Sequence, residues 1–184
     1  MLPVILRSER LVLDAPTMGD RDAVAEYCTD PVFERYLTTP WPYLREHAEG
    51  FVREHVPGGW AGDREYTWAL RLGDGEPLLG VLGVRTERHD LGFWLGAPHR
   101  GNGYLPEAAR AVIDWMFADR GVQRIRWEAI VGNTASAAAA RKLGFAYTGV
   151  APADVPSRDG SRPRAWHGIL AASHTRDEKP GWPA

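Results

Sequence analysis

The sequence has little of what would point to disulfides, membranes or nucleic acid. It holds one cysteine, Cys28, in 184 residues, so no intrachain disulfide can form and a reducing compartment such as the cytoplasm is expected. No apolar run approaches the ~20 residues of a membrane span, and Met1–Leu6 is too short for a signal-peptide core. The net charge of −2 gives no broad reason to expect direct binding to nucleic acid or an anionic membrane. We therefore expect a soluble cytoplasmic protein of one domain.

Metal and nucleotide signatures are absent as well. The six histidines show neither paired spacing nor a neighbouring cysteine, so no metal site is expected. Gly101 and Gly103 are followed by Pro106 at the position where a dinucleotide-binding fingerprint needs its third glycine. No lysine follows them, as a P-loop would require. These details exclude both nucleotide-binding motifs.

What the sequence does contain is a strand, two glycines and a helix start in close succession. Leu91–Leu95 is apolar and aromatic-rich, which is typical of a short strand. Pro106 and Glu107 mark the first turn of a helix. Between them, Gly101 and Gly103 let successive backbone N–H groups point at one spot, where the helix dipole adds positive potential. The pattern predicts a cradle for a phosphate or pyrophosphate, although a simple tight connection would leave the same pattern.

The remaining segments predict an alternation of strands and helices. The strand–helix–strand unit from Leu91 to Val131 predicts that its two strands are parallel. Loops are expected at residues 57–62 and 152–163, and the polar segment 173–184 is expected to be a flexible tail. Helices are expected from Thr17 to Tyr27, Val32 to Leu37, Leu44 to His55, Pro106 to Asp119 and Asn133 to Leu143. Seven strands are expected, at Arg10–Leu13, Tyr66–Leu70, Leu78–Val84, Leu91–Leu95, Ile125–Val131, Phe145–Val150 and Ala165–Leu170.

Several motifs occur in a fixed order from this central strand onward. They are Phe93-Trp94-Leu95, Arg100-Gly101-Asn102-Gly103-Tyr104, Glu107-Ala108, Asn133 with Ser136, and Lys142-Leu143-Gly144-Phe145. Together they resemble the GNAT acetyltransferase superfamily, specifically its RimJ/RimL-like branch, over roughly Arg7 to Leu170. The resemblance implies one α/β (α+β) domain, residues 1–172. Its sheet would be mixed, mostly antiparallel and seven-stranded, with splayed central strands and helices on both faces.

The resemblance also implies a reaction and a binding site for the acetyl donor. The expected reaction moves acetyl from acetyl-CoA to a primary amine by direct attack in a ternary complex. The side chain of Arg100 is either a phosphate ligand or an exposed loop residue, and Asn133 is either a contact of the pantetheine arm, a helix N-cap, or both. Pro98 departs from the superfamily pattern, in which Gln or Arg often stands at that position, but it leaves the backbone cradle intact. The coenzyme A contacts implied by the resemblance are Phe93, Trp94, Leu95, Arg100, Gly101, Asn102, Gly103, Tyr104, Asn133 and Ser136.

Catalytic residues are less clearly marked. Many superfamily members carry a tyrosine seven residues after the asparagine as general acid, but this chain has Ala140 there. The resemblance assigns the same task to Ser136, which could instead bond to a carbonyl of its own helix. For the general base, Asp154 and Glu128 are the carboxylate candidates. The other options are a histidine (His89, His99 or His167, each of which could equally be solvated or structural) and an ordered water, because an α-amine has a pKa near 8.

The acceptor site is expected between the N-terminal helices and the loop at 152–163. The expected acceptor is a protein N-terminal α-amine of the ribosomal-protein type. A small-molecule N-acetyltransferase acting on amino acids or antibiotics, and a non-catalytic acyl-CoA-binding protein, are the alternatives. The protein would be a monomer or a homodimer. The aromatic candidates for lining the site, or for covering the sheet edge instead, are Tyr36, Trp41, Tyr43, Trp60 and Trp166.

Overall fold

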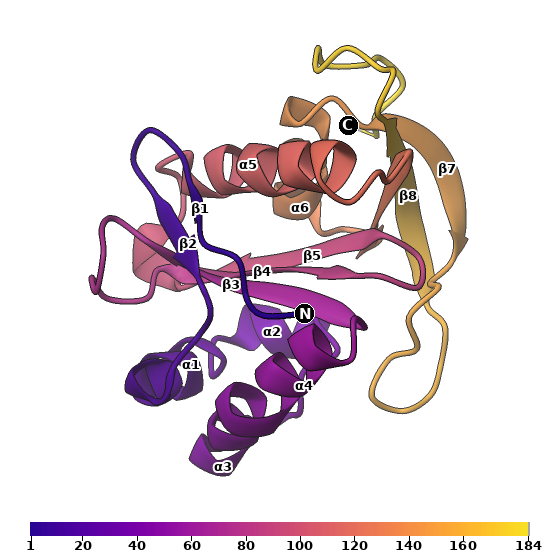
Figure 1. Ribbon diagram of the computed structural model, residues 1–184. Helices are drawn as coiled ribbons and strands as arrows, with labels where there is room; N and C mark the ends of the chain where they lie inside the picture. Colours follow the sequence, from indigo (N-terminus) through magenta and orange to yellow (C-terminus); the bar gives the residue numbers. More distant parts are fainter. Residues whose placement is uncertain (184) are drawn as a thin grey trace.

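A single sheet of eight strands separates two groups of helices (Figure 1). The computed structural model describes residues 1–183. The strands are β1 (Leu6–Arg7), β2 (Val12–Asp14), β3 (Glu65–Arg71), β4 (Gly80–Arg85), β5 (Asp90–Leu95), β6 (Arg124–Ile130), β7 (Ala146–Pro152) and β8 (Arg164–Ala171). The helices are α1 (Arg21–Tyr27), α2 (Pro31–Tyr36), α3 (Arg45–Gly50), α4 (Val56–Ala61), α5 (Tyr104–Ala118) and α6 (Thr134–Lys142).

The sheet has the strand order β1-β2-β3-β4-β5-β6-β8-β7. All neighbouring strands are antiparallel except β5 and β6, which are parallel as predicted. The predicted count of seven strands is one too low. The missed strand is β1, whose two residues pair with Val12 and Leu13 and are too few to show a strand pattern in the sequence.

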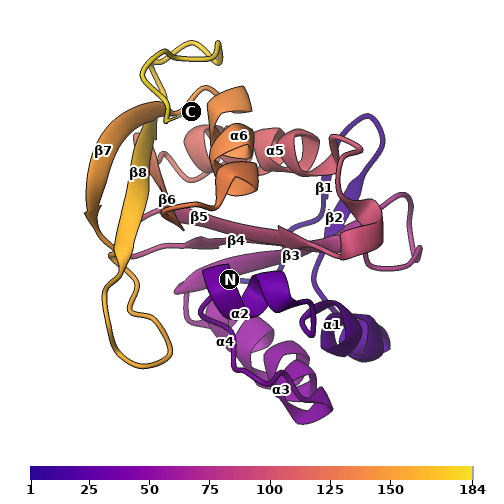
Figure 2. The same ribbon diagram turned by 180° about the vertical axis from the view of Figure 1, so that it is seen from behind.

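Helices cover both faces of the sheet, as predicted. Helices α5 and α6 lie on one face and α1 to α4 on the other, and the view from behind shows the same division (Figures 1 and 2). On the inner side of α5, Val112 and Ile113 are fully buried. A second cluster, which includes Val24, Phe33 and the single cysteine, Cys28, lies between α1–α3 and the sheet. Burial of each such large apolar side chain contributes about 1.5–3 kcal/mol.

One predicted loop is a helix. Residues 57–62 were expected to be irregular because of a proline and three glycines, but α4 runs through most of them. Proline is tolerated in the first turn of a helix, where its missing N–H would have no partner. Trp60 anchors this helix, because its side chain is buried and its Nε1 donates to the carbonyl oxygen of Thr67 at 3.1 Å. Trp60 is therefore a core residue and does not line an acceptor site.

The two central strands separate along their length. Strands β5 and β6 are paired only at Asp90 and Arg126, where the backbone N–H of Arg126 donates to His89 at 2.8 Å. Beyond this point, toward Leu95 and Ile130, the strands have no pairing with each other. The predicted splay is thus confirmed. We call the space between the diverging ends the β5/β6 opening.

The segment after β8 contains no helix or strand within residues 173–183. It does make contacts with the domain: the indole of Trp182 packs against Trp127 and Tyr147, with ring centroids 5.4 and 5.5 Å apart. The side chain of Arg176 donates to Asp114 on α5 at 2.7 Å. A domain boundary at residue 172 and a flexible tail after it remain predictions. Across residues 1–183, no helix is both long and apolar enough to cross a membrane.

Candidate active site

The turn between β5 and α5 presents free backbone donors. Gly101 and Gly103 have φ angles of +82° and +77°, a left-handed conformation that favours glycine. Within the described residues 1–183, the backbone N–H groups of Gly101, Asn102 and Gly103 have no hydrogen-bond acceptor. Tyr104 begins α5, so its N–H is also free of the helix ladder. This geometry fits the predicted cradle for the pyrophosphate of coenzyme A.

The side chain of Arg100 is engaged within the protein. Its Nε donates to the carbonyl oxygen of Leu95 at 3.1 Å, and its Nη1 lies 2.8 Å from Oδ2 of Asp30. The Asn102 side chain likewise donates to backbone carbonyls of its own turn, at 3.2 and 3.3 Å. Both side chains hold the shape of the turn, which leaves the backbone to contact a phosphate. The structure therefore gives no support to Arg100 as a phosphate ligand.

Along β5, successive side chains face opposite sides of the sheet. Phe93 and Leu95 pack with the core under α5, whereas Trp94 meets the ring of Phe33 on the other face at 5.5 Å. The side chains therefore serve packing, and the backbone edge of β5 that faces β6 lacks a strand partner beyond Asp90. An unpaired strand edge of this kind fits the predicted contact with the pantetheine arm.

Ser136 lies in the first turn of α6, beside strand β6. The side chain of Asn133 accepts the backbone N–H of Ser136 at 3.2 Å, so Asn133 is the N-cap of α6. The indole Nε1 of Trp127 donates to Oγ of Ser136 at 3.0 Å. Because this bond occupies a lone pair of the hydroxyl oxygen, the hydroxyl proton remains available to donate elsewhere.

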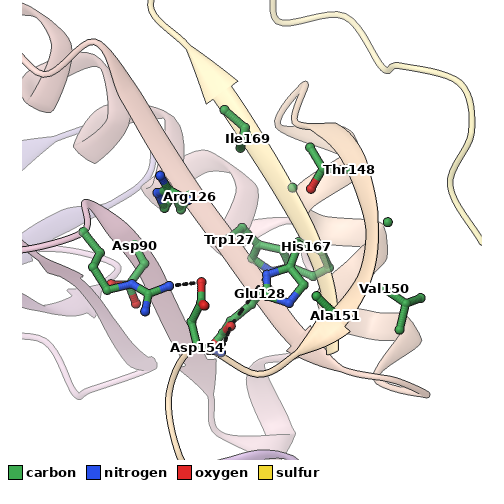
Figure 3. Close-up of a pocket in the computed structure, with 13 residues that line it drawn as sticks. Asp90, Arg126, Trp127, Glu128, Thr148, Val150, Ala151, Asp154, His167 and Ile169 are labelled. Carbon is green, nitrogen blue, oxygen red and sulfur yellow. Dashed lines mark hydrogen bonds and ion pairs between the residues drawn. The ribbon is translucent and has the colours of Figure 1, made fainter. Parts of the chain in front are cut away.

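The opposite face of β6 borders a cavity of about 280 Å³ (Figure 3). Glu128 lies there, and its two carboxylate oxygens accept the backbone N–H groups of Asp154 at 2.7 Å and Val155 at 2.9 Å. His167, directly opposite Glu128 on β8, has its Nδ1 3.8 Å from Oε2 of Glu128. Glu128 thus connects the strand at the β5/β6 opening to the loop that follows β7.

Four further charged residues line this cavity: Arg88, Asp90, Arg126 and Asp154. Asp154 forms an ion pair with Arg88. Asp90 is buried, and burial raises its pKa, although Arg85 and Arg88 oppose that rise. Ligand atoms of Glu128, Asp154 and His167 lie within 4.8 Å of one another, a proximity that histidine spacing could not predict. Since both carboxylates already accept protein donors, a metal ion would have to compete with those contacts.

Comparison with known proteins identifies the family. The sequence profile of the acetyltransferase (GNAT) domain matches residues 10–146. The chain belongs to the GNAT acetyltransferases. It is an acetyl-CoA-dependent N-acetyltransferase, and the free N–H groups of the turn and the β5/β6 opening fit that acetyl donor.

Relatives and solved structures agree with this assignment. A protein of Bacillus licheniformis described as the uncharacterized N-acetyltransferase p20 is 24% identical over 151 residues, which cover 79% of this chain and 84% of that protein. RimJ of Mycobacterium smegmatis, solved with CoA-disulfide, matches with a TM-score of 0.79 at 17% identity, over 95% of this chain and 89% of that one. RimL, described as a ribosomal L7/L12 alpha-N-protein acetyltransferase in complex with coenzyme A, matches with a TM-score of 0.77 at 18% identity, over 91% and 98%. These likenesses confirm the GNAT fold and place RimJ and RimL among its structural neighbours.

In this GNAT domain, the predicted acceptor aromatics separate into two groups. Tyr43 and Trp166 are 8% and 7% exposed and belong to the two core clusters, so lining of an acceptor site is not supported for either. Their positions beside prolines or on a strand did not reveal which way the rings point. Trp41 is half-buried against the second cluster, and the hydroxyl of Tyr36 donates to Gly132, next to the N-cap of α6, at 2.9 Å.

Sequence reasoning missed Arg10 and its contact with Glu107. Nε of Arg10 donates to Glu107 at 2.7 Å, and its Nη1 donates to the carbonyl oxygen of Asn102 at 3.2 Å. Burial alone would raise the pKa of Glu107, but hydrogen bonds from Ser8 and Arg10 lower it. Arg10 also lies over the ring of Tyr104, at 5.0 Å, so this GNAT domain carries a cation beside its cradle. No local pattern could have joined residues so far apart in the sequence.

Proposed function

We propose that this enzyme acetylates a protein N-terminal α-amine by direct attack on acetyl-CoA within a ternary complex. The observation that carries the proposal is the placement of Trp127 and Glu128, neighbours on β6 whose side chains point to opposite faces. Trp127 contacts Ser136 on the α6 side, whereas Glu128 faces the charged cavity. A proton donor for the thiol and a carboxylate for the amine thus flank one strand, beside the β5/β6 opening.

The donor side of the site is formed by backbone groups. The free N–H groups of residues 101–104 would bind the pyrophosphate, with the dipole of α5 favouring its negative charge, whereas the N–H of Arg100 already donates to Ala97. The pantetheine arm would lie in the β5/β6 opening along Phe93–Leu95, where β5 lacks a strand partner. Asn133 would add a contact from its position at the start of α6 while also acting as its N-cap.

In the chemical step, the amine nitrogen bonds to the thioester carbonyl carbon and the carbon–sulfur bond breaks. Ser136 donates its hydroxyl proton to the leaving thiolate, since Trp127 holds the hydroxyl oxygen by donating to it. The amine loses its proton to Glu128, directly or through water. The serine then regains a proton from solvent and Glu128 releases one. A positioned proton donor or acceptor of this kind typically contributes about 10²–10⁴-fold in rate.

Between the two carboxylate candidates, the geometry favours Glu128. It lies on the strand that borders the β5/β6 opening, whereas Asp154 extends from a loop and is held by Arg88. Asp154 then positions Glu128, because its backbone N–H donates to that carboxylate.

The character of the cavity supports a peptide acceptor. Its lining combines charged side chains with apolar ones such as Val150 and Ile169, and a second cavity of about 730 Å³ adjoins it. A closed aromatic pocket would suit a small molecule better. RimL, which shares the fold, is described as a ribosomal L7/L12 alpha-N-protein acetyltransferase. A cytoplasmic location and a monomeric or homodimeric state remain predictions.

The test is thiol release from acetyl-CoA with three acceptor panels: N-terminal peptides, free amino acids and aminoglycosides. The proposal expects turnover with peptides, and mass spectrometry should locate one acetyl group on the α-amine. Turnover restricted to amino acids or aminoglycosides would replace the peptide acceptor by a small molecule. Binding of acetyl-CoA without turnover on any panel would favour the non-catalytic alternative.

A further inference from the structure

One cation in the acceptor cavity has no partner. Arg126 lines both the 280 Å³ cavity and the adjoining 730 Å³ cavity, and its side chain is exposed (Figure 3). Within residues 1–183, its guanidinium forms no ion pair and no hydrogen bond. The other arginine shared by the two cavities, Arg88, is neutralised by Asp154. Of the two shared arginines, Arg126 is thus the one without an ion-pair partner where the two cavities meet.

Arg126 and Glu128 are near neighbours on the same face of β6. The two residues are two apart on β6 and therefore point to the same face, about 7 Å from each other along the strand. An amine that approaches Glu128 can extend toward Arg126, away from the side on which the cradle lies. A group bound by Arg126 would then sit several bonds from the nitrogen that reacts.

We infer that Arg126 binds a carboxylate of the acceptor, so that the enzyme prefers an amine bearing an acidic group several bonds from the reacting nitrogen. This inference rests on the proposed function. A guanidinium and a carboxylate form charge-assisted, often bidentate hydrogen bonds, which are stronger than neutral ones. Two acceptors share this chemistry: a peptide with Asp or Glu as its second residue, and a free acidic amino acid.

The test compares kcat/KM for paired acceptors that differ only in carboxylate against amide. One arm uses short peptides with Glu or Gln at the second position, and the other uses free glutamate and glutamine. We expect wild-type enzyme to favour the acidic member of at least one pair by about tenfold or more. The arm that shows the preference identifies the source of the carboxylate.

Arg126→Gln should reduce that ratio to near one, and Arg126→Lys should restore part of it. Arg124→Gln is the matched control, because Arg124 is exposed on the same face of the same strand but lines only the outer cavity. It should keep the wild-type ratio.

A wild-type ratio near one in both arms, with amines still acetylated, would overturn the inference and leave the proposed function intact. An equal loss of the ratio in both variants would also overturn it, because a long-range field would then explain the preference. Absence of transfer to every amine would overturn the proposed function and the inference with it.

Discussion

The indole N–H of Trp127 donates a hydrogen bond to Oγ of Ser136, at 3.0 Å. The donor is a buried strand residue and the acceptor is a half-buried residue in the first turn of α6. A serine in a helix commonly bonds to a carbonyl of the preceding turn. Here the oxygen is held from the sheet instead, which fixes the hydroxyl and leaves its proton free for a leaving thiolate.

Trp127→Phe should lower kcat by about threefold to tenfold, because the hydroxyl loses a bond worth roughly 1 kcal/mol that orients it. The affinity for acetyl-CoA should stay unchanged, since the cradle lies elsewhere. Trp115→Phe is the control: Trp115 is buried in the same core cluster, and its indole makes no hydrogen bond within residues 1–183. Equal effects on kcat in the two variants would mean that packing, and not the bond to Ser136, matters.

Gly103→Ala should weaken acetyl-CoA binding by about tenfold or more. The φ angle of +77° at Gly103 costs an L-residue roughly 1–2 kcal/mol, so relaxation would turn the free N–H groups away from the ligand. Gly160→Ala is a matched control, because Gly160 has a φ angle of +78° in the loop between β7 and β8. Isothermal titration of both variants measures the difference. Unchanged affinity in Gly103→Ala would argue against the cradle.

Arg71→Met should destabilise the protein by about 3–5 kcal/mol. The guanidinium of Arg71 is buried and donates to both oxygens of Asp20 at 2.7 Å, and its Nε donates to Asp14 at 2.8 Å. Its removal leaves a buried carboxylate without a counter-charge. Urea unfolding tests this, with Arg7→Met as control, because the ion pair of Arg7 with Asp74 is exposed and should contribute nothing measurable.

The hydrogen bonds between Arg71 and Asp20 should also affect how the stability of the fold changes at low pH. Burial alone would raise the pKa of Asp20, but hydrogen bonds from Arg71 and Thr17 outweigh it and lower the pKa below its usual 3.8. Because the pKa of Asp20 is lower in the folded state than in the unfolded state, its ionised carboxylate stabilises the fold at pH values above the unfolded-state pKa. This stabilisation is lost as the pH falls through the folded-state pKa. Asp20→Asn should therefore be less stable at neutral pH and should lose less stability below about pH 4. Parallel acid profiles for the two proteins would contradict this role.

The sequence predicted those parts of the site that depend on local patterns. The β5 strand, the two left-handed glycines and the start of α5 follow one another within 15 residues, from Asp90 to Tyr104, so their chemistry can be read from neighbours in the chain. The parallel pairing of β5 with β6 followed from the intervening helix. Ser136 and its N-cap Asn133 were also close enough in sequence for their spacing to be informative.

Long-range contacts could not be predicted in this way. Arg10 reaches Glu107 across 97 residues, and the carboxylate of Glu128 holds a loop 26 residues further on. Trp60 was expected in a loop because of its glycine and proline neighbours, yet it is buried. The amino-acid composition of a segment indicates which secondary structure it can form. Whether an aromatic ring in it is buried depends on the apolar surface that the fold places beside it.

Single-turnover acetyl transfer in Ser136→Ala, with Thr134→Ala as control, tests whether Ser136 is the proton donor to the thiolate. Thr134 carries a hydroxyl in the same helical turn but is exposed to solvent. Ser136→Ala should lower the rate of transfer tenfold or more, about 1.4 kcal/mol of barrier, while acetyl-CoA affinity is retained and the control is unaffected. An unchanged rate in Ser136→Ala would show that the thiolate leaves without this proton and would contradict the mechanism.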